Sequence, residues 1–219
     1  DSLSEIRLLA QSSLRYRRQI LTMKHYFSRH DATVMMLDDL TSDTADKTVH
    51  SVAHGVIRLE ELAPNYGAER RRLRVLKYRS RRFRGGYHDF TITTGGLTVF
   101  PRLVAADHRM PFTRSKLSTG IPAFDGLLGG GVDTGSSTLI LGPAGTDQSL
   151  IAINFAMAAI ARGEKAAIFA FDEELGLLYD RMRGMGIDLE AAEANGMLKI
   201  VQTDAAELSP GEFADRVSR

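Results

Sequence analysis

The chain has 219 residues, of which 43% are hydrophobic and 25% charged, a composition typical of a globular protein. It contains no cysteine, which excludes a disulfide scaffold and any thiolate metal site and fits a reducing, cytoplasmic compartment. The longest apolar run, residues 150–161, is too short to span a bilayer, and the N-terminus shows no signal-peptide pattern. The net charge is only +1, although residues 70–84 contain eight Arg and one Lys and no acid.

The first half of the chain predicts two helices followed by strands. A capping-box pattern at residues 2–5 opens the first helix, and apolar residues at helical spacing predict a second over 14–27, which Asp31 interrupts. The continuous apolar run at 32–37 predicts a buried strand. Further strands are predicted over 55–59 and 73–80, followed by a β-hairpin over 90–100 around a Gly-Gly turn.

The basic stretch at 70–84 has two interpretations. Clustered arginines are typical of a nucleic-acid surface, but no aromatic RNA-binding motif accompanies them. Edge strands of sheets also carry Lys and Arg, so a solvated or subunit-facing strand is the more economical interpretation.

The second half alternates strands and helices. A turn-rich segment at 118–131 precedes predicted strands at 137–141, 166–171 and 197–201, and helices follow at 150–161, 175–185 and from residue 209. This alternation predicts an α/β fold with a mostly parallel sheet flanked by helices. In such sheets ligands bind at the carboxyl ends of the strands.

One glycine-rich turn lies between a predicted strand and a helix, where a phosphate-binding loop works through backbone N–H groups and the helix dipole. It consists of Gly142, Pro143, Ala144, Gly145, Thr146, Asp147, Gln148 and Ser149. The pattern for such a loop is G-x-x-x-x-G-K-[ST]. Gly142 and Ser149 fit it, whereas Asp147 replaces the second glycine and Gln148 replaces the lysine.

Asp172 and Glu173 follow the predicted strand at 166–171. A carboxylate at this position can orient a water molecule for attack on a γ-phosphate, although strand ends are also often acidic merely because they are solvated. His50 and His54 lie four residues apart on a segment expected to be a strand, and this spacing does not indicate a metal site.

In this order the motifs resemble the KaiC-like branch of the RecA-type P-loop ATPases. STGIP at 118–122, LLGGG at 127–131 and the loop at 142–146 resemble the start of a KaiC-type domain, and Asp172 and Glu173 match the family's paired catalytic acids. Residues 77–79 (KYR) and 86–92 (GYHDFTI) are similar to the segment whose Lys and Arg reach the nucleotide of a neighbouring subunit.

The resemblance implies that residues 1–108 are the C-terminal part of one KaiC/RecA-like domain and residues 109–219 the N-terminal part of the next. It implies ATP and Mg²⁺ as cofactors, with Asp1 and Ser149 at magnesium-coordinating positions and Lys77 and Arg79 sensing a neighbour's phosphates. The parent protein is expected to be a tandem two-domain protein that assembles as a hexameric ring. The two halves either pack together as a circular permutant or form two incomplete sheets.

The expected function is that of an ATP-binding or ATPase protein of signal-transduction type, with a degenerate second nucleotide site and signalling partners unidentified. Alone, the chain is expected to be inactive. The alternatives are a non-catalytic scaffold for ring assembly and, supported only by the arginines, a RecA-like DNA-binding protein. We expect neither a nucleic-acid nor a membrane partner.

Overall fold

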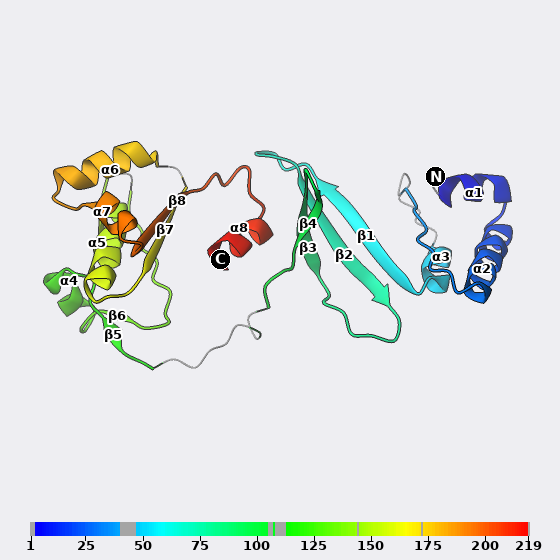
Figure 1. Cartoon of the computed structure of the whole chain (residues 1–219), viewed down its shortest axis with the longest axis horizontal. Coiled ribbons are helices and arrows are strands. Elements are labelled where there is room, and N and C mark those ends of the chain that lie inside the picture. Colours follow the sequence, from blue (N-terminus) through cyan, green and yellow to red (C-terminus); the bar gives the residue numbers. More distant parts are fainter. Residues whose placement is uncertain are drawn as a thin grey trace. The chain divides into compact units, whose positions relative to one another are not determined.

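The computed structural model describes residues 3–39, 47–104, 107, 113–143, 145–171 and 173–218. The chain divides into two compact units (Figure 1). Unit 1 comprises Asp1–Leu62 and Arg70–Arg102, and unit 2 comprises Ala63–Glu69 and Leu103–Arg219. Each unit is described by itself.

Three helices form the core of unit 1: α1 (Leu3–Ala10), α2 (Ser13–Arg29) and α3 (Lys47–Val52). The Ser12 hydroxyl caps α2 by accepting the Arg15 N–H at 3.3 Å. The two predicted helices are thereby confirmed, and α2 ends shortly before Asp31, whose backbone is left-handed. The buried apolar residues of these helices form one cluster: Leu3, Ala10, Tyr16, Ile20, Val49 and Val52.

The sheet of unit 1 has four antiparallel strands in chain order: β1 (Gly55–Leu62), β2 (Arg70–Tyr78), β3 (Tyr87–Thr93) and β4 (Gly96–Phe100). The basic stretch thus forms a strand, β2, as predicted. The β3–β4 hairpin also forms as expected, with Thr93 opposite Gly96 and a positive φ at Gly95 and Gly96.

Two expectations for unit 1 are wrong. Residues 32–37 form no strand, and Met35 and Leu37 are 87% and 68% exposed. An apolar run becomes a buried strand only where a neighbouring strand pairs with its backbone, and no strand in the described part of the chain lies beside it. In addition, His50 lies in helix α3 rather than on a strand.

Unit 2 contains a small antiparallel pair, β5 (Lys116–Leu117) and β6 (Val132–Asp133), around the short helix α4 (Pro122–Leu127). The chain continues through α5 (Gln148–Ala161), β7 (Ala166–Ala170), α6 (Leu175–Gly184), α7 (Leu189–Ala194), β8 (Leu198–Gln202) and α8 (Pro210–Ser218). Strands β7 and β8 pair in parallel, from Ala166 opposite Leu198 to Ala170 opposite Gln202.

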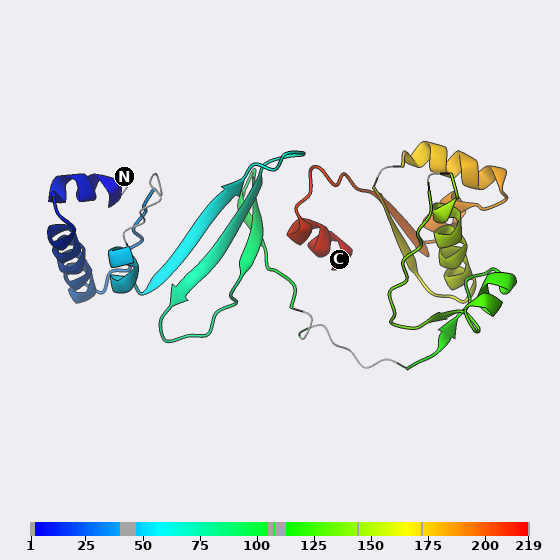
Figure 2. The same cartoon turned by 180° about the vertical axis from the view of Figure 1, so that it is seen from behind.

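Helices cover both faces of the β7–β8 pair. One face packs against α5, α6 and α7, where Ile153, Leu178 and Met182 are buried against Ile168 and other strand residues. Side chains alternate along a strand, so the neighbouring Phe169 points to the other face, where its ring meets Phe213 of α8 at 5.5 Å. Figures 1 and 2 show α5 and α8 on opposite sides of the two strands.

The predicted strand at 137–141 is also not formed. Residues 137–143 have no regular structure, and Leu139 and Leu141 are 79% and 83% exposed. In the described residues, β7 pairs only with β8, so this segment has no ladder to join. Within the residues that the structure describes, the chain is therefore α/β, its four-stranded sheet is antiparallel and only the β7–β8 pair is parallel, so these residues do not form the mostly parallel sheet that was expected.

None of the described helices is long and apolar enough to cross a membrane.

Candidate functional site

The glycine-rich loop of unit 2 leads directly into α5. The Thr146 hydroxyl donates to the Pro143 carbonyl oxygen at 2.8 Å, closing a tight turn. A Cβ atom at Gly142 would clash with Thr146 Oγ1 and Gln148 Nε2, so a larger residue there would force these two side chains to move. Ala144, predicted to bind cofactor with its neighbours, lies outside the described residues.

Asp147 caps the N-terminus of α5 with a left-handed backbone, at φ 52° and ψ 42°. Glycine adopts this conformation without cost, and aspartate is one of the few other residues that tolerate it. The substitution therefore keeps the loop's backbone shape. It also places a carboxylate at the helix N-terminus, and this carboxylate makes no capping hydrogen bond.

The Gln148 side chain folds back onto its own loop. Its Nε2 donates to the carbonyl oxygens of Gly142 at 2.6 Å and Pro143 at 3.2 Å. Because both partners are acceptors, the amide group must present its nitrogen. A lysine at this position would reach out to phosphates, whereas Gln148 satisfies the loop from within.

Arg181 of α6 joins the loop to the end of β7. Its Nη2 donates to Ser149 Oγ at 2.9 Å and to Glu173 Oε1 at 2.5 Å, and its Nη1 lies 3.5 Å from Asp147 Oδ1. Arg181 and Glu173 are each about one-third exposed. Sequence reasoning did not identify Arg181, which brings together three predicted site residues.

The acids after β7 have separate surroundings. Glu173 pairs with Arg181, whereas Glu174 caps α6 by accepting the Leu177 N–H at 2.8 Å. That backbone hydrogen bond lowers the pKa of Glu174. Asp172, predicted to be catalytic with Glu173, and Asp1, predicted to coordinate magnesium, lie outside the described residues.

Lys77 and Arg79, predicted to sense nucleotide, contact the C-terminal end of α3 in unit 1. Lys77 Nζ donates to the carbonyl oxygens of His50 and Ser51 at 2.8 and 3.1 Å, and Arg79 donates to Ser51 at 2.8 Å. Lys24 donates to the Val52 carbonyl oxygen at 3.2 Å. These cations satisfy carbonyl groups that a helix end leaves free. Burial lowers the pKa of Lys77, and the charges of Arg79 and Lys24 lower it further.

The arginines of β2 are partly neutralised within the sheet of unit 1. Glu60 pairs with Arg58 at 2.9 Å and with Arg72 at 2.6 Å, and Glu61 pairs with Arg71 at 3.0 Å. The Arg72 hydrogen bond is the main cause that lowers the pKa of Glu60. Residues 70–84 therefore carry fewer unpaired positive charges than the sequence alone indicates.

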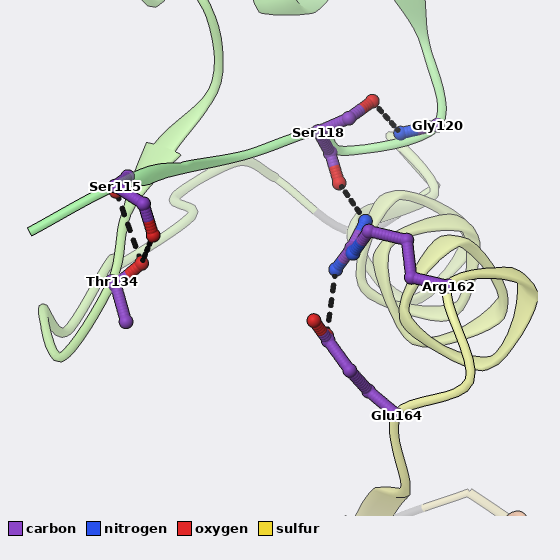
Figure 3. Close-up of polar contacts among 6 residues, drawn as sticks. All are labelled: Ser115, Ser118, Gly120, Thr134, Arg162 and Glu164. Carbon is purple, nitrogen blue, oxygen red and sulfur yellow. Dashed lines mark hydrogen bonds and ion pairs between the residues drawn. The ribbon is translucent and has the colours of Figure 1, made fainter. Parts of the chain in front are cut away.

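The turn before α4 is held by a second polar cluster. Asp125 accepts hydrogen bonds from the Ser118 hydroxyl at 2.5 Å and from the Thr119 hydroxyl at 2.7 Å and N–H at 2.8 Å. These bonds lower the pKa of Asp125, with the Ser118 bond the largest contribution. Figure 3 shows that the Ser118 carbonyl also accepts a hydrogen bond from Arg162 at the end of α5. Residues 118–120 are thus fixed to the C-terminal end of α5, the helix that follows the glycine-rich loop.

A parallel strand pair covered by helices, with a glycine-rich turn opening one helix, is the arrangement of nucleotide-binding α/β proteins. The family described as "ATPase: KaiC" matches residues 1–104 and 117–214. The chain therefore belongs to the KaiC ATPase family.

Curated relatives carry the name "Circadian clock oscillator protein KaiC". The protein from Picosynechococcus sp. is 30% identical over 185 residues, which cover 84% of this chain and 35% of the relative. The protein from Acaryochloris marina is 34% identical over 134 residues, covering 61% and 26%. The protein from Parathermosynechococcus lividus is 28% identical over 190 residues, covering 84% and 35%. The chain thus spans about a third or less of the length of these relatives.

Proposed function

We propose that this chain is the middle of a KaiC-type ATPase, in which residues 1–108 end one domain and residues 109–219 begin the next. The loop at 142–149 is then the second domain's nucleotide site in a degenerate form. The two separate family matches, 1–104 and 117–214, support this arrangement because the interval between them falls at the proposed junction.

The observation that carries the degenerate site is the direction of the Gln148 side chain. Its amide bonds the loop carbonyls of Gly142 and Pro143, and no cation at this position points outward to neutralise phosphates. Asp147 adds a carboxylate where an anion would bind. At an effective dielectric of 20, like charges about 4 Å apart repel by roughly 4 kcal/mol. The residues present therefore do not fit a magnesium–nucleotide complex.

In this proposal ATP and Mg²⁺ act elsewhere in the parent protein, and unit 2 preserves the fold for assembly of a hexameric ring. Asp1, Lys77 and Arg79 belong to the first domain and keep their proposed family roles in such an assembly, whereas Asp172 and Glu173 lie in the second domain and have no nucleotide to act on. A cytoplasmic location and a role in signal transduction belong to the same proposal. The scaffold alternative differs only in assigning no hydrolysis to the parent at all.

Restoration of the loop pattern tests the proposal. The double variant Asp147→Gly, Gln148→Lys restores the glycine and the lysine of the pattern. It should bind MgATP at least about a hundredfold more tightly than the unchanged chain. Removal of the Asp147 repulsion and addition of the lysine charge together contribute more than about 2.7 kcal/mol. Isothermal titration calorimetry measures the affinity of the variant and sets an upper limit on the affinity of the unchanged chain.

The matched control is Asp31→Gly, Gln19→Lys, which makes the same two substitutions at exposed positions outside the loop, with Asp31 also in a left-handed conformation, and it should leave nucleotide binding unchanged. Equal affinity in the unchanged and restored chains, with both chains binding nucleotide, would refute the degenerate site. Hydrolysis of ATP by the full-length parent separates the ATPase from the scaffold alternative.

A further inference from the structure

Arg181 contacts three groups that come from three different segments. Asp147 lies in the glycine-rich loop, Ser149 in the first turn of α5, and Glu173 just after β7. A guanidinium group is suited to this because its donors form a rigid planar fork. The cluster pairs one cation with two carboxylates, so the described part of the site carries no positive charge for an anion.

The Ser149 contact is the informative one. In a working loop this hydroxyl coordinates the magnesium ion of the nucleotide complex. Here it accepts a hydrogen bond from Arg181 at 2.9 Å. Binding of Mg²⁺ at the hydroxyl would place two cations against one oxygen atom, so Arg181 would first have to leave.

We propose that Arg181 is an internal counter-ion that takes the place of magnesium at the Ser149 hydroxyl and latches the loop to α6. This inference rests on the proposed degenerate site. The latch holds the first turn of α5, whose Leu150 and Ile151 N–H groups bond the Asp147 carbonyl oxygen at 3.0 and 3.4 Å. The Arg181 contacts therefore hold Asp147 and Ser149 in place at the start of α5 when no ligand is bound, and the site has a structural role.

Hydrogen–deuterium exchange of the full chain tests the latch. Arg181→Ala should speed exchange of the peptide 142–153 by roughly three- to tenfold, the range for a partly exposed, charge-assisted contact. Exchange of a peptide over 54–78 in unit 1 should not change. Arg183→Ala is the matched control, because Arg183 lies on the same helix and pairs with Asp180 and Glu190, at 2.7 and 2.6 Å, outside the loop.

Unchanged exchange at 142–153 in Arg181→Ala, or an equal increase in Arg183→Ala, overturns the latch. If Arg181→Ala fails to fold, Asp147→Asn decides instead, since it removes one charge and leaves Arg181 in place. It should speed exchange of the same peptide by about twofold, and no increase overturns the proposal. Binding of MgATP by the unchanged chain would refute the degenerate site, a separate result from the exchange measurement.

Discussion

The Tyr179 hydroxyl donates a hydrogen bond to Glu193 Oε2 at 2.6 Å, and Glu193 Oε1 accepts the Ile200 N–H at 3.0 Å. One carboxylate thus links α6, α7 and β8. The Glu193 hydrogen bond, with burial and the charges of Glu193 and Glu190, raises the pKa of Tyr179 to about 12.

This pKa predicts a loss of stability at alkaline pH. An unfolded tyrosine has a pKa of about 10, so the fold favours the protonated form, and its contribution is complete below about pH 10 and disappears as the pH rises to about 12. Tyr179→Phe should flatten this loss in urea unfolding, whereas Tyr66→Phe, at an exposed position, should not. An unchanged alkaline loss in Tyr179→Phe would contradict the assignment.

Residue-level chemistry was only partly predictable from the sequence. The substitutions at Asp147 and Gln148 are visible against the loop pattern, because the pattern assigns a role to each position. The role of Arg181 is not visible in the sequence, because nothing in the sequence of α6 distinguishes Arg181 from Arg183. Only the packing of α6 against α5 brings its guanidinium to Ser149.

At the level of elements, helix α6 packs one side against the core of unit 2. Met182 is fully buried, whereas Leu177 on the same helix is 69% exposed. Met182→Ala should lower the free energy of unfolding of unit 2 by about 2–5 kcal/mol, because it leaves a cavity in the core. Leu177→Ala should change it by less than about 0.5 kcal/mol. Chemical denaturation measures both, and equal effects would contradict the packing.

Every predicted helix formed, whereas two predicted strands did not, and the difference has a physical reason. A helix satisfies its backbone hydrogen bonds within its own segment, so the patterns at α2 and α5 were sufficient. A strand depends on a neighbour, and residues 32–37 and 137–141 have none in the described chain. Strands β2, β3, β7 and β8 formed because each has a partner that is also in the chain.

At the scale of the whole molecule, each unit has its own buried cluster. Ile20 belongs to the cluster of unit 1 and Met182 to that of unit 2. Differential scanning calorimetry should therefore resolve two unfolding transitions. Ile20→Ala should lower the midpoint temperature of one transition, and Met182→Ala should lower that of the other. A single transition that both variants shift equally would show instead that the two halves fold as one body.

In the proposed function, the chain is a member of the KaiC ATPase family whose loop keeps its backbone shape but lacks the groups that would bind phosphate and magnesium. The family resemblance could be recognised from the order of motifs, because that order survives the loss of individual loop residues. The contacts within the loop could not be predicted from the sequence, because they depend on the direction of the Gln148 amide and on the position of Arg181.

The most direct measurement is a calorimetric titration of the unchanged chain with MgATP. We expect no binding up to about 1 mM, because the Gln148 amide bonds the loop's own carbonyl groups, Arg181 occupies the Ser149 hydroxyl, and Asp147 repels phosphate. Binding at micromolar affinity, abolished by Ser149→Ala, would contradict this expectation.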